Sequence, residues 1–215
     1  LRYLDLMGGE KPHLLIEVNN NLGATTKIQY AASTKFYLAD KAAGTPWITK
    51  LPFPVHVVEE VIVEEKWRET RFASRYSYHH GYFDGHEREF RGFGRVEQVD
   101  TEHYGKFIVG NTASPYITNN HELYQPPIKT ITWFHTGAFL DRERILSHSE
   151  SEYFPHWFEK LRPDEENIFG DFQENVLPEP DLAAQNLSVQ EWREALRACK
   201  GMKLRQEIYE LDVDA

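Results

Sequence analysis

Residues 71–99 read RFASRYSYHHGYFDGHEREFRGFGRVEQV. Two runs of alternating aromatic and polar residues meet at Asp84-Gly85, a pair that suits the positive φ angles of a two-residue type I′ turn. We therefore predict a long antiparallel hairpin in this stretch. The two-residue loop fixes its register, which pairs Tyr78 with Arg91, His80 with Glu89, and Tyr82 with Glu87.

Strand-like patterns also precede the hairpin. Alternating apolar residues or β-branched residues predict strands at 13–18, 25–30, 35–39, 45–50 and 55–65. In the last of these the apolar parity shifts between Val58 and Val61. This shift indicates either a β-bulge or a strand that is covered on both faces.

The strand pattern loosens after Asp100, where glycine, asparagine and proline accumulate as far as Pro126-Pro127. We place a boundary there and expect two units, residues 1–125 and residues 126–215. The second unit should contain strands at 129–135 and 202–211, a helix that starts at Asp141 and ends before Pro155, and an acidic loop at 169–182.

One helix has a strong signature near the end of the chain. Ser188 and Glu191 form a capping box, and Gly201 closes the segment. Four residues recur at helical spacing between them: Val189, Trp192, Leu196 and Cys199. The expected fold is mainly β, built of long antiparallel hairpins, with one or two short helices in the C-terminal third.

Composition bounds the class of protein. The chain has 215 residues, of which 40% are hydrophobic, and this is enough for a packed core. Its formal net charge of −10 disfavours nucleic acid and anionic membranes as partners. No apolar run reaches the ~20 residues that span a bilayer. Because the sequence opens at Leu1 and closes in strand-like residues, we expect an excerpt of a longer protein.

The residues with reactive side chains suggest no metal site. His86-Glu-Arg-Glu-Phe90 begins like a zinc-protease motif, but Phe90 stands where the second histidine is needed. Adjacent residues of a strand point to opposite faces of the sheet, so His79 and His80 cannot share a metal ion. We interpret each of them as a polar residue that pairs with a residue of the neighbouring strand. The lone Cys199 excludes an internal disulfide, and its place on the helical stripe indicates a core residue.

Paired carboxylates are the residues that a glycosidase uses. Glu87 and Glu89 share a face of the predicted strand, and Glu64 and Glu65 are adjacent, but cross-strand pairing explains the first pair equally well. No phosphate-binding glycine loop or nucleophile elbow is present. We expect no catalytic, cofactor-binding or metal site and no cofactor. The aromatic residues are typical of sheet packing, and they also suit sugar binding: Tyr76, Tyr78, Tyr82, Phe83, Phe90 and Phe93.

The hairpin sequence also resembles a known family. Residues 76–98 resemble a segment of the B components of insecticidal Toxin complexes (Tc), the TcdB/SpvB-like family. Further stretches resemble the same family in the same order: 20–30, 47–54, 132–137 and 195–211. The resemblance covers most of the chain and is to the middle regions (midN and midC) of the B component.

The resemblance implies a structural role. In this family the B and C components together close into a hollow, RHS/YD-like β-shell that encloses the toxic part of the C component. A propeller outside the middle regions docks that shell on the A component. The resemblance therefore implies a shell-wall segment of a secreted toxin that is made in the bacterial cytoplasm. No family catalytic residue maps to this chain, and we expect no enzyme, no nucleic-acid partner and no direct membrane insertion.

Two other classes of function remain open from the sequence. The aromatic residues suit a β-sandwich module that binds carbohydrate or another protein, and Glu87 with Glu89 suits a glycosidase. Binding to a glycan array would favour the first alternative. Hydrolysis that is lost on Glu89→Gln would favour the second.

Overall fold

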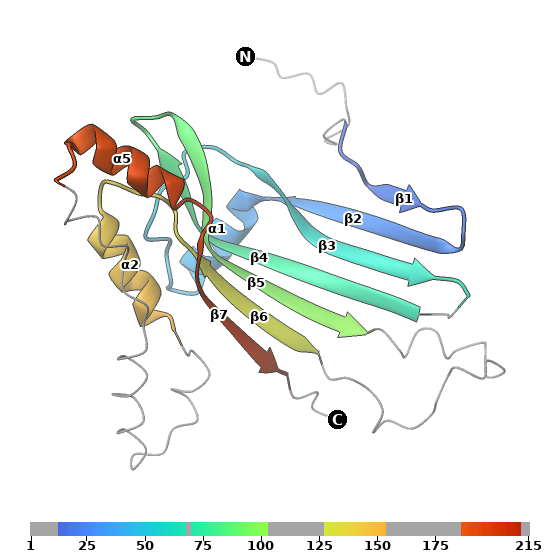
Figure 1. Ribbon diagram of the computed structural model, residues 1–215. Coiled ribbons are helices and arrows are strands. Elements are labelled where there is room, and N and C mark those ends of the chain that lie inside the picture. Colours follow the sequence, from blue (N-terminus) through green and yellow to red (C-terminus); the bar gives the residue numbers. More distant parts are fainter. Residues whose placement is uncertain (1–12, 68–69, 103–126, 154–185, 212–215) are drawn as a thin grey trace, which may run out of the picture.

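The computed structural model describes residues 13–67, 70–102, 127–153 and 186–211 (Figure 1). Three helices of ten residues lie among seven strands in this part of the chain. In chain order the elements are β1 (Glu17–Asn19), β2 (Ala24–Ala32), α1 (Ser33–Ala42), β3 (His56–Glu65), β4 (Thr70–Asp84), β5 (Glu89–Glu102), β6 (Ile128–Phe134), α2 (Arg142–Ser151), α5 (Val189–Ala198) and β7 (Lys203–Glu210).

All seven strands form one antiparallel sheet, in the order in which they occur along the chain. The expectation of a mainly β fold with long hairpins is confirmed. β6 pairs with β5, so the sheet contains strands from both sides of the boundary that we placed at residue 125. The division into 1–125 and 126–215 stays a prediction.

Most of the expected strands are present. The patterns at 25–30, 55–65, 129–135 and 202–211 correspond to β2, β3, β6 and β7, whereas the strand expected at 13–18 is limited to β1. Of the two alternatives for the parity shift in β3, the structure shows the bulge. Gln29 pairs with Glu60 and Tyr30 pairs with Val58, so Glu59 is the extra residue.

The predicted register of the β4–β5 hairpin is wrong. Asp84 pairs with Glu89, the turn comprises residues 85–88, and a second shift in register follows at Tyr82. Tyr78 therefore lies opposite Val96 and His79 opposite Arg95. The side chain of Asp84 accounts for the longer turn, because its Oδ1 accepts hydrogen bonds from the backbone N–H groups of residues 86 and 87.

The strands predicted at 35–39 and 45–50 are also wrong. Residues 33–42 form α1, and 45–50 lie in the loop that leads to β3. Ser33 fixes the start of the helix, because its N–H donates to Val55 O and its Oγ accepts from Val55 N–H. Phe36 is the only large apolar side chain of α1 that is buried, so the helix carries no apolar stripe that a sequence pattern would reveal.

The capping box of α5 is confirmed. Ser188 Oγ accepts from Glu191 N–H, and the Glu191 carboxylate accepts from Ser188 N–H at 2.8 Å. Leu196 and Cys199 are buried as expected, whereas Val189 is 66% exposed. α2 begins after Asp141 as expected, but Asp141 has a φ of 57° and its side chain does not cap the helix. Pro155 and the acidic loop at 169–182 lie outside the described residues.

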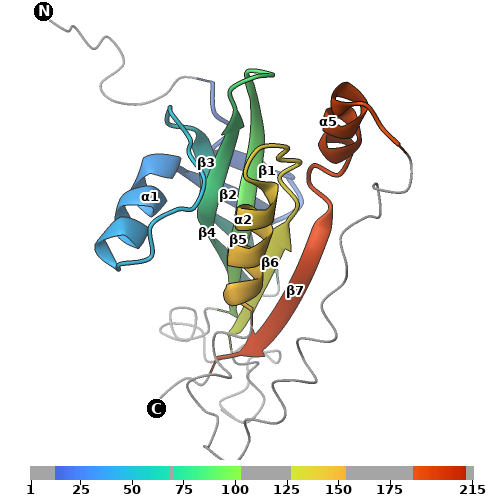
Figure 2. The ribbon, with the colours of Figure 1, turned by 90° about the vertical axis from the view of Figure 1, so that its left-hand side faces the viewer.

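Two apolar clusters form the core. The first contains Phe36, Trp47 and Val57, and the second contains Ile131, Trp133 and Tyr153. Figure 2 shows α1 on one side of the β4–β5 hairpin and α5 on the other. None of the three helices described is both long enough and apolar enough to cross a membrane.

Candidate functional site: a buried polar cluster on the sheet

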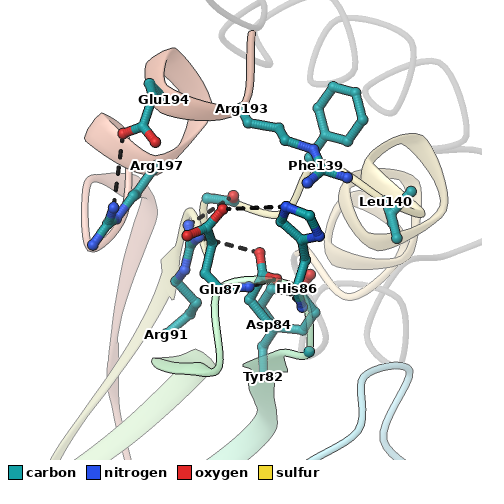
Figure 3. A pocket seen from close by; sticks show the side chains of 12 residues that line it. Tyr82, Asp84, His86, Glu87, Arg91, Phe139, Leu140, Arg193, Glu194 and Arg197 are labelled. Atoms are coloured by element: carbon teal, nitrogen blue, oxygen red, sulfur yellow. Dashed lines mark hydrogen bonds and ion pairs between the residues drawn. The ribbon is translucent and has the colours of Figure 1, made fainter. Parts of the chain in front are cut away.

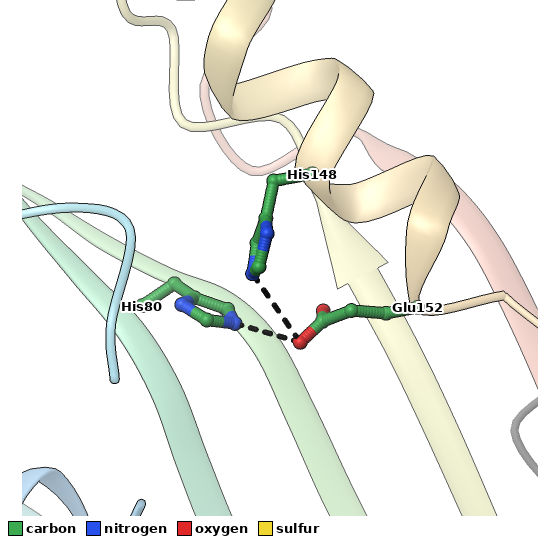
Figure 4. A group of neighbouring side chains, drawn as sticks. All are labelled: His80, His148 and Glu152. Atoms are coloured by element: carbon green, nitrogen blue, oxygen red, sulfur yellow. Dashed lines mark hydrogen bonds and ion pairs between the residues drawn. The ribbon is translucent and has the colours of Figure 1, made fainter. Parts of the chain in front are cut away.

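A cluster of polar side chains lies where α2 packs on β4, β5 and β6. The carboxylate of Glu152, which directly follows α2, is its centre (Figure 4). Glu152 Oε1 lies 3.0 Å from His80 Nε2 and 2.8 Å from Arg95 Nη1, and Oε2 accepts from Trp133 Nε1 at 3.2 Å. His148 Nε2, one helical turn before Glu152, lies 3.7 Å from Oε1. Residues from four elements therefore meet at one carboxylate.

The hydrogen-bond partners of His80 indicate which tautomer its ring adopts. The backbone N–H of Ile48 points at His80 Nδ1 at 3.3 Å, which makes Nδ1 an acceptor. Nε2 then carries the ring hydrogen and donates a hydrogen bond to the Glu152 carboxylate. The His80 side chain is only 6% exposed, and its φ of 57° turns it away from the direction that regular strand parity predicts.

Charge pairing keeps Glu152 ionised. Burial opposes ionisation of this carboxyl, but the hydrogen bond from His80 and the charge of Arg95 outweigh it and lower its pKa to about 2. For Arg95, burial lowers the pKa, but Glu152 and Glu97 raise it above its ordinary value. Burial lowers the pKa of His148, which favours its neutral imidazole form.

The ionic network continues along the sheet from Arg95. Glu97 pairs with Arg95 and with Lys129, whose Nζ lies 2.8 Å from Oε2. Burial opposes ionisation of Glu97, but these cations lower its pKa to about 2. His79 joins Glu97, at 3.8 Å, to Asp40 of α1, at 2.7 Å. The network thus links both α1 and α2 to the central strands.

Sequence reasoning did not find this cluster. We paired His80 with Glu89, but its partner Glu152 is 72 residues distant in the chain. The one local signal was the spacing of His148 and Glu152, which places both side chains on one face of a helix. His86, in contrast, is exposed at the hairpin tip, where its Nε2 lies 3.7 Å from Glu87 Oε1.

A pocket of about 270 Å³ lies between the hairpin tip and α5 (Figure 3). Its charged groups are largely paired with one another. Arg91 lies 3.1 Å from Asp84 Oδ2 and donates to Gly137 O, Arg197 pairs with Glu194, and the Arg193 guanidinium lies over the ring of Phe139. These pairings indicate that the residues around the pocket pack the hairpin tip against α5 and do not form a reactive site.

The two carboxylates considered for glycoside hydrolysis do not form a matched pair. Glu87 lies in the turn, so the prediction that it shares a strand face with Glu89 is wrong. The hydrogen bond from Lys200, with the nearby Arg91 and Arg197, lowers the pKa of Glu89. A general acid needs a raised pKa, so Glu89 is unsuited to that role. In the same way, the hydrogen bond from Lys27 lowers the pKa of Glu64.

The aromatic residues of the hairpin serve packing. Tyr78 and Phe93 lie against the Phe36 cluster with their ring centroids 4.9 Å apart, and Phe90 packs on Phe93. Phe83 packs on Phe53 of the loop before β3. These contacts favour the interpretation as sheet packing over that as a row of stacked sugar-binding rings.

Comparison with known proteins places this geometry in a family. Residues 5–119 match the family model described as the insecticide toxin TcdB middle/N-terminal region. The chain belongs to this family. The resemblance found in the sequence is thereby confirmed for the midN region. No curated protein matches the chain.

Solved structures agree with the family. The chain is similar to the TcdB2-TccC3 crystal structure, with 26% identity and a TM-score of 0.62 over 94% of this chain. In the structure of the Photorhabdus luminescens Tc holotoxin pore, the match has 29% identity and a TM-score of 0.61 over 94% of this chain. A third match, to TcdB2-TccC3-Cdc42, has 26% identity and a TM-score of 0.61, also over 94% of this chain. The segment spans only 8–9% of the length of these solved chains.

Proposed function

We propose that this chain is a structural segment of the B component of a secreted bacterial Tc toxin. It would form part of the wall of the hollow shell that, with the C component, encloses the toxic polypeptide. The observation that carries the proposal is the match to TcdB2 in complex with TccC3, which extends over 94% of this chain.

The sheet suits a wall physically. Each strand pairs with its neighbours in chain order, and within the described residues β1 and β7 each pair with one strand only. The outer edges of β1 and β7 offer backbone N–H and C=O groups to further strands. A strip of this kind can continue on both sides into the rest of a larger shell.

The chemistry of the described side chains supports a role without catalysis. The partly buried carboxylates Glu97 and Glu152 have lowered pKa values and are paired with cations, which holds the sheet together but leaves neither as a proton donor at pH 7. We propose that the segment itself is not an enzyme.

The proposal also covers partners and location. The C component would complete the shell, and the A component would be contacted through a propeller outside this segment. The parent protein would be made in the bacterial cytoplasm and act after secretion. Neither nucleic acid nor direct membrane insertion has a part in this function, in agreement with the net charge of −10.

Deletion of residues 71–99 from the full B component tests the proposal. This deletion removes most of β4 and β5, the central hairpin of the sheet, so assembly with the C component and toxin delivery should both be lost. As a control, His86 and Glu87 at the tip of the hairpin are replaced by alanine, which leaves the strands intact and should preserve assembly. A deleted protein that still forms a closed, protease-resistant shell and delivers its cargo would refute the wall assignment.

A further inference from the structure

Three potential metal ligands meet in the buried polar cluster. His80 of β4, His148 of α2 and Glu152 after α2 each offer one ligand atom, and these three atoms all lie within 4.8 Å of one another, with both imidazole nitrogens directed at the Glu152 carboxylate (Figure 4). We propose that they bind a divalent transition metal ion, with zinc as the ion that the set fits best. The proposal departs from the sequence-based expectation of no metal site and is independent of the proposed wall function.

The separations suit a tetrahedral ion. Zinc–nitrogen and zinc–oxygen bonds of ~2.0–2.1 Å place neighbouring ligand atoms roughly 3.3 Å apart at the tetrahedral angle. Glu152 Oε1 lies 3.0 Å from His80 Nε2 and 3.7 Å from His148 Nε2. The two imidazole nitrogens lie within 4.8 Å of each other, so they must approach each other by side-chain rotation before one ion can bond all three atoms.

An unsatisfied imidazole nitrogen supports the site. His148 Nε2 is buried and has no hydrogen-bond partner in the described structure. A buried polar atom of this kind calls for a ligand, an ion or a water.

The surroundings of Glu152 help to orient it. Trp133 Nε1 donates to Oε2, which leaves Oε1 directed at the two histidines. Hydrogen bonds from outside the ligand set fix ligand orientation in this way in many metal sites. His148 and Glu152 lie one helical turn apart, as paired ligands on a helix do.

Two existing contacts must change when the ion binds. The metal replaces the proton on His80 Nε2, the proton moves to Nδ1, and the 3.3 Å contact from Ile48 N–H opens. Arg95 gives up Glu152 Oε1 but keeps its ion pair with Glu97. The free energy lost with one long hydrogen bond and one shared ion pair is small compared with the binding free energy of a structural zinc site.

The charge of the wider cluster also permits a cation. The carboxylates of Glu152, Glu97 and Asp40 outnumber the cations Arg95 and Lys129, and Arg144, which also acts on His148, is paired with Asp141. A bound ion would connect α2 to β4 by metal–ligand bonds, with a fourth coordination position left for water. We expect it to clamp the helix on the sheet.

Metal titration of the chelator-treated full chain tests the proposal. Zinc should bind in a 1:1 ratio in calorimetry and raise the melting temperature, and cobalt(II) should give the intense visible absorption of a tetrahedral site. His148→Ala should reduce the affinity by more than the ~10–100-fold that loss of an outer-shell partner costs. His86→Ala is the matched control, because His86 is exposed at the hairpin tip, and this variant should bind as the unaltered chain does.

The outcomes separate the proposal from its rivals. Equal binding by the unaltered chain and His148→Ala would place the metal elsewhere and overturn the proposal. An unaltered chain that binds no zinc, or that gives only the weak spectrum of octahedral cobalt, would show that a proton and not a metal joins His80 to Glu152. The cobalt spectrum of the unaltered chain decides the question even if His148→Ala does not fold.

Discussion

The backbone of Gly81 lies directly against the indole ring of Trp47: a Cβ atom on Gly81 would stand 2.7 Å from Cζ3 of that ring. The same atom would stand 2.9 Å from Leu51 Cδ2. Because all three groups belong to the packed core beside β4, the glycine is required by the close approach of the loop at 45–55 to the strand.

Gly81→Ala should destabilise the chain by ~1–3 kcal/mol, since the added methyl group overfills this contact. Gly85→Ala on the same hairpin is the control. A Cβ there meets no atom within 4 Å and the φ of Gly85 is not positive, so this substitution should be neutral or slightly stabilising. Urea unfolding measures both, and equal losses would contradict the contact with Trp47.

Ser188→Ala should lower the free energy of unfolding by about 1 kcal/mol, because Ser188 Oγ accepts the hydrogen bond that caps α5. Ser147→Ala, on the exposed face of α2, removes a hydroxyl without removing a cap and should change stability little. The two variants are compared by thermal unfolding. If both behave alike, the capping box contributes nothing.

Stability should fall in acid between about pH 4.5 and pH 2. The pKa values of Glu97 and Glu152 in the folded chain are both about 2, below the ordinary glutamate value of 4.5, so their ionised forms stabilise the fold above pH 4.5 and that contribution is lost as the pH falls. Glu97→Gln should be less stable at pH 7 and lose less stability across this range. The non-titrating Ser147→Ala should follow the unaltered chain, and an unaltered slope in Glu97→Gln would contradict the ion pairs.

Cys199 should react slowly with a thiol reagent in the folded chain and fast in denaturant. Its side chain lies at the end of α5, the residue is 9% exposed, and Sγ lies 3.5 Å from Ala195 O. The rate of this reaction is followed by the absorbance of the aromatic thiolate that Cys199 displaces from an aromatic disulfide reagent. Rapid labelling under native conditions would show that the end of α5 opens.

The sequence predicted the strands better than their registers. Alternation located β2, β3, β6 and β7, because one face of each strand differs in polarity from the other, and the shift in parity within β3 coincides with the bulge at Glu59. The turn after Asp84 was missed because an aspartate side chain that binds two backbone N–H groups competes with the simplest loop. Two added residues in the loop displaced every pairing that we had assigned.

The polar cluster could not be predicted for a different reason. Glu152 meets His80, Arg95 and Trp133 only after α2 has packed across the sheet, and no local pattern encodes that approach. α1 was likewise hidden, because a helix that buries one large apolar residue has almost no periodic signal.

The agreement of strand order with chain order has a consequence for synthesis. A strand that emerges from the ribosome finds its partner already made, since the preceding strand in the sequence is its neighbour in the sheet. The sheet can therefore grow by one strand at a time as translation proceeds, with a single growing edge at each stage. If the ribosome pauses after β5, the β4–β5 hairpin is complete but the outer edge of β5 has no partner until β6 is made. The rate of translation therefore sets how long the unpaired backbone groups of β5 can bind another strand instead.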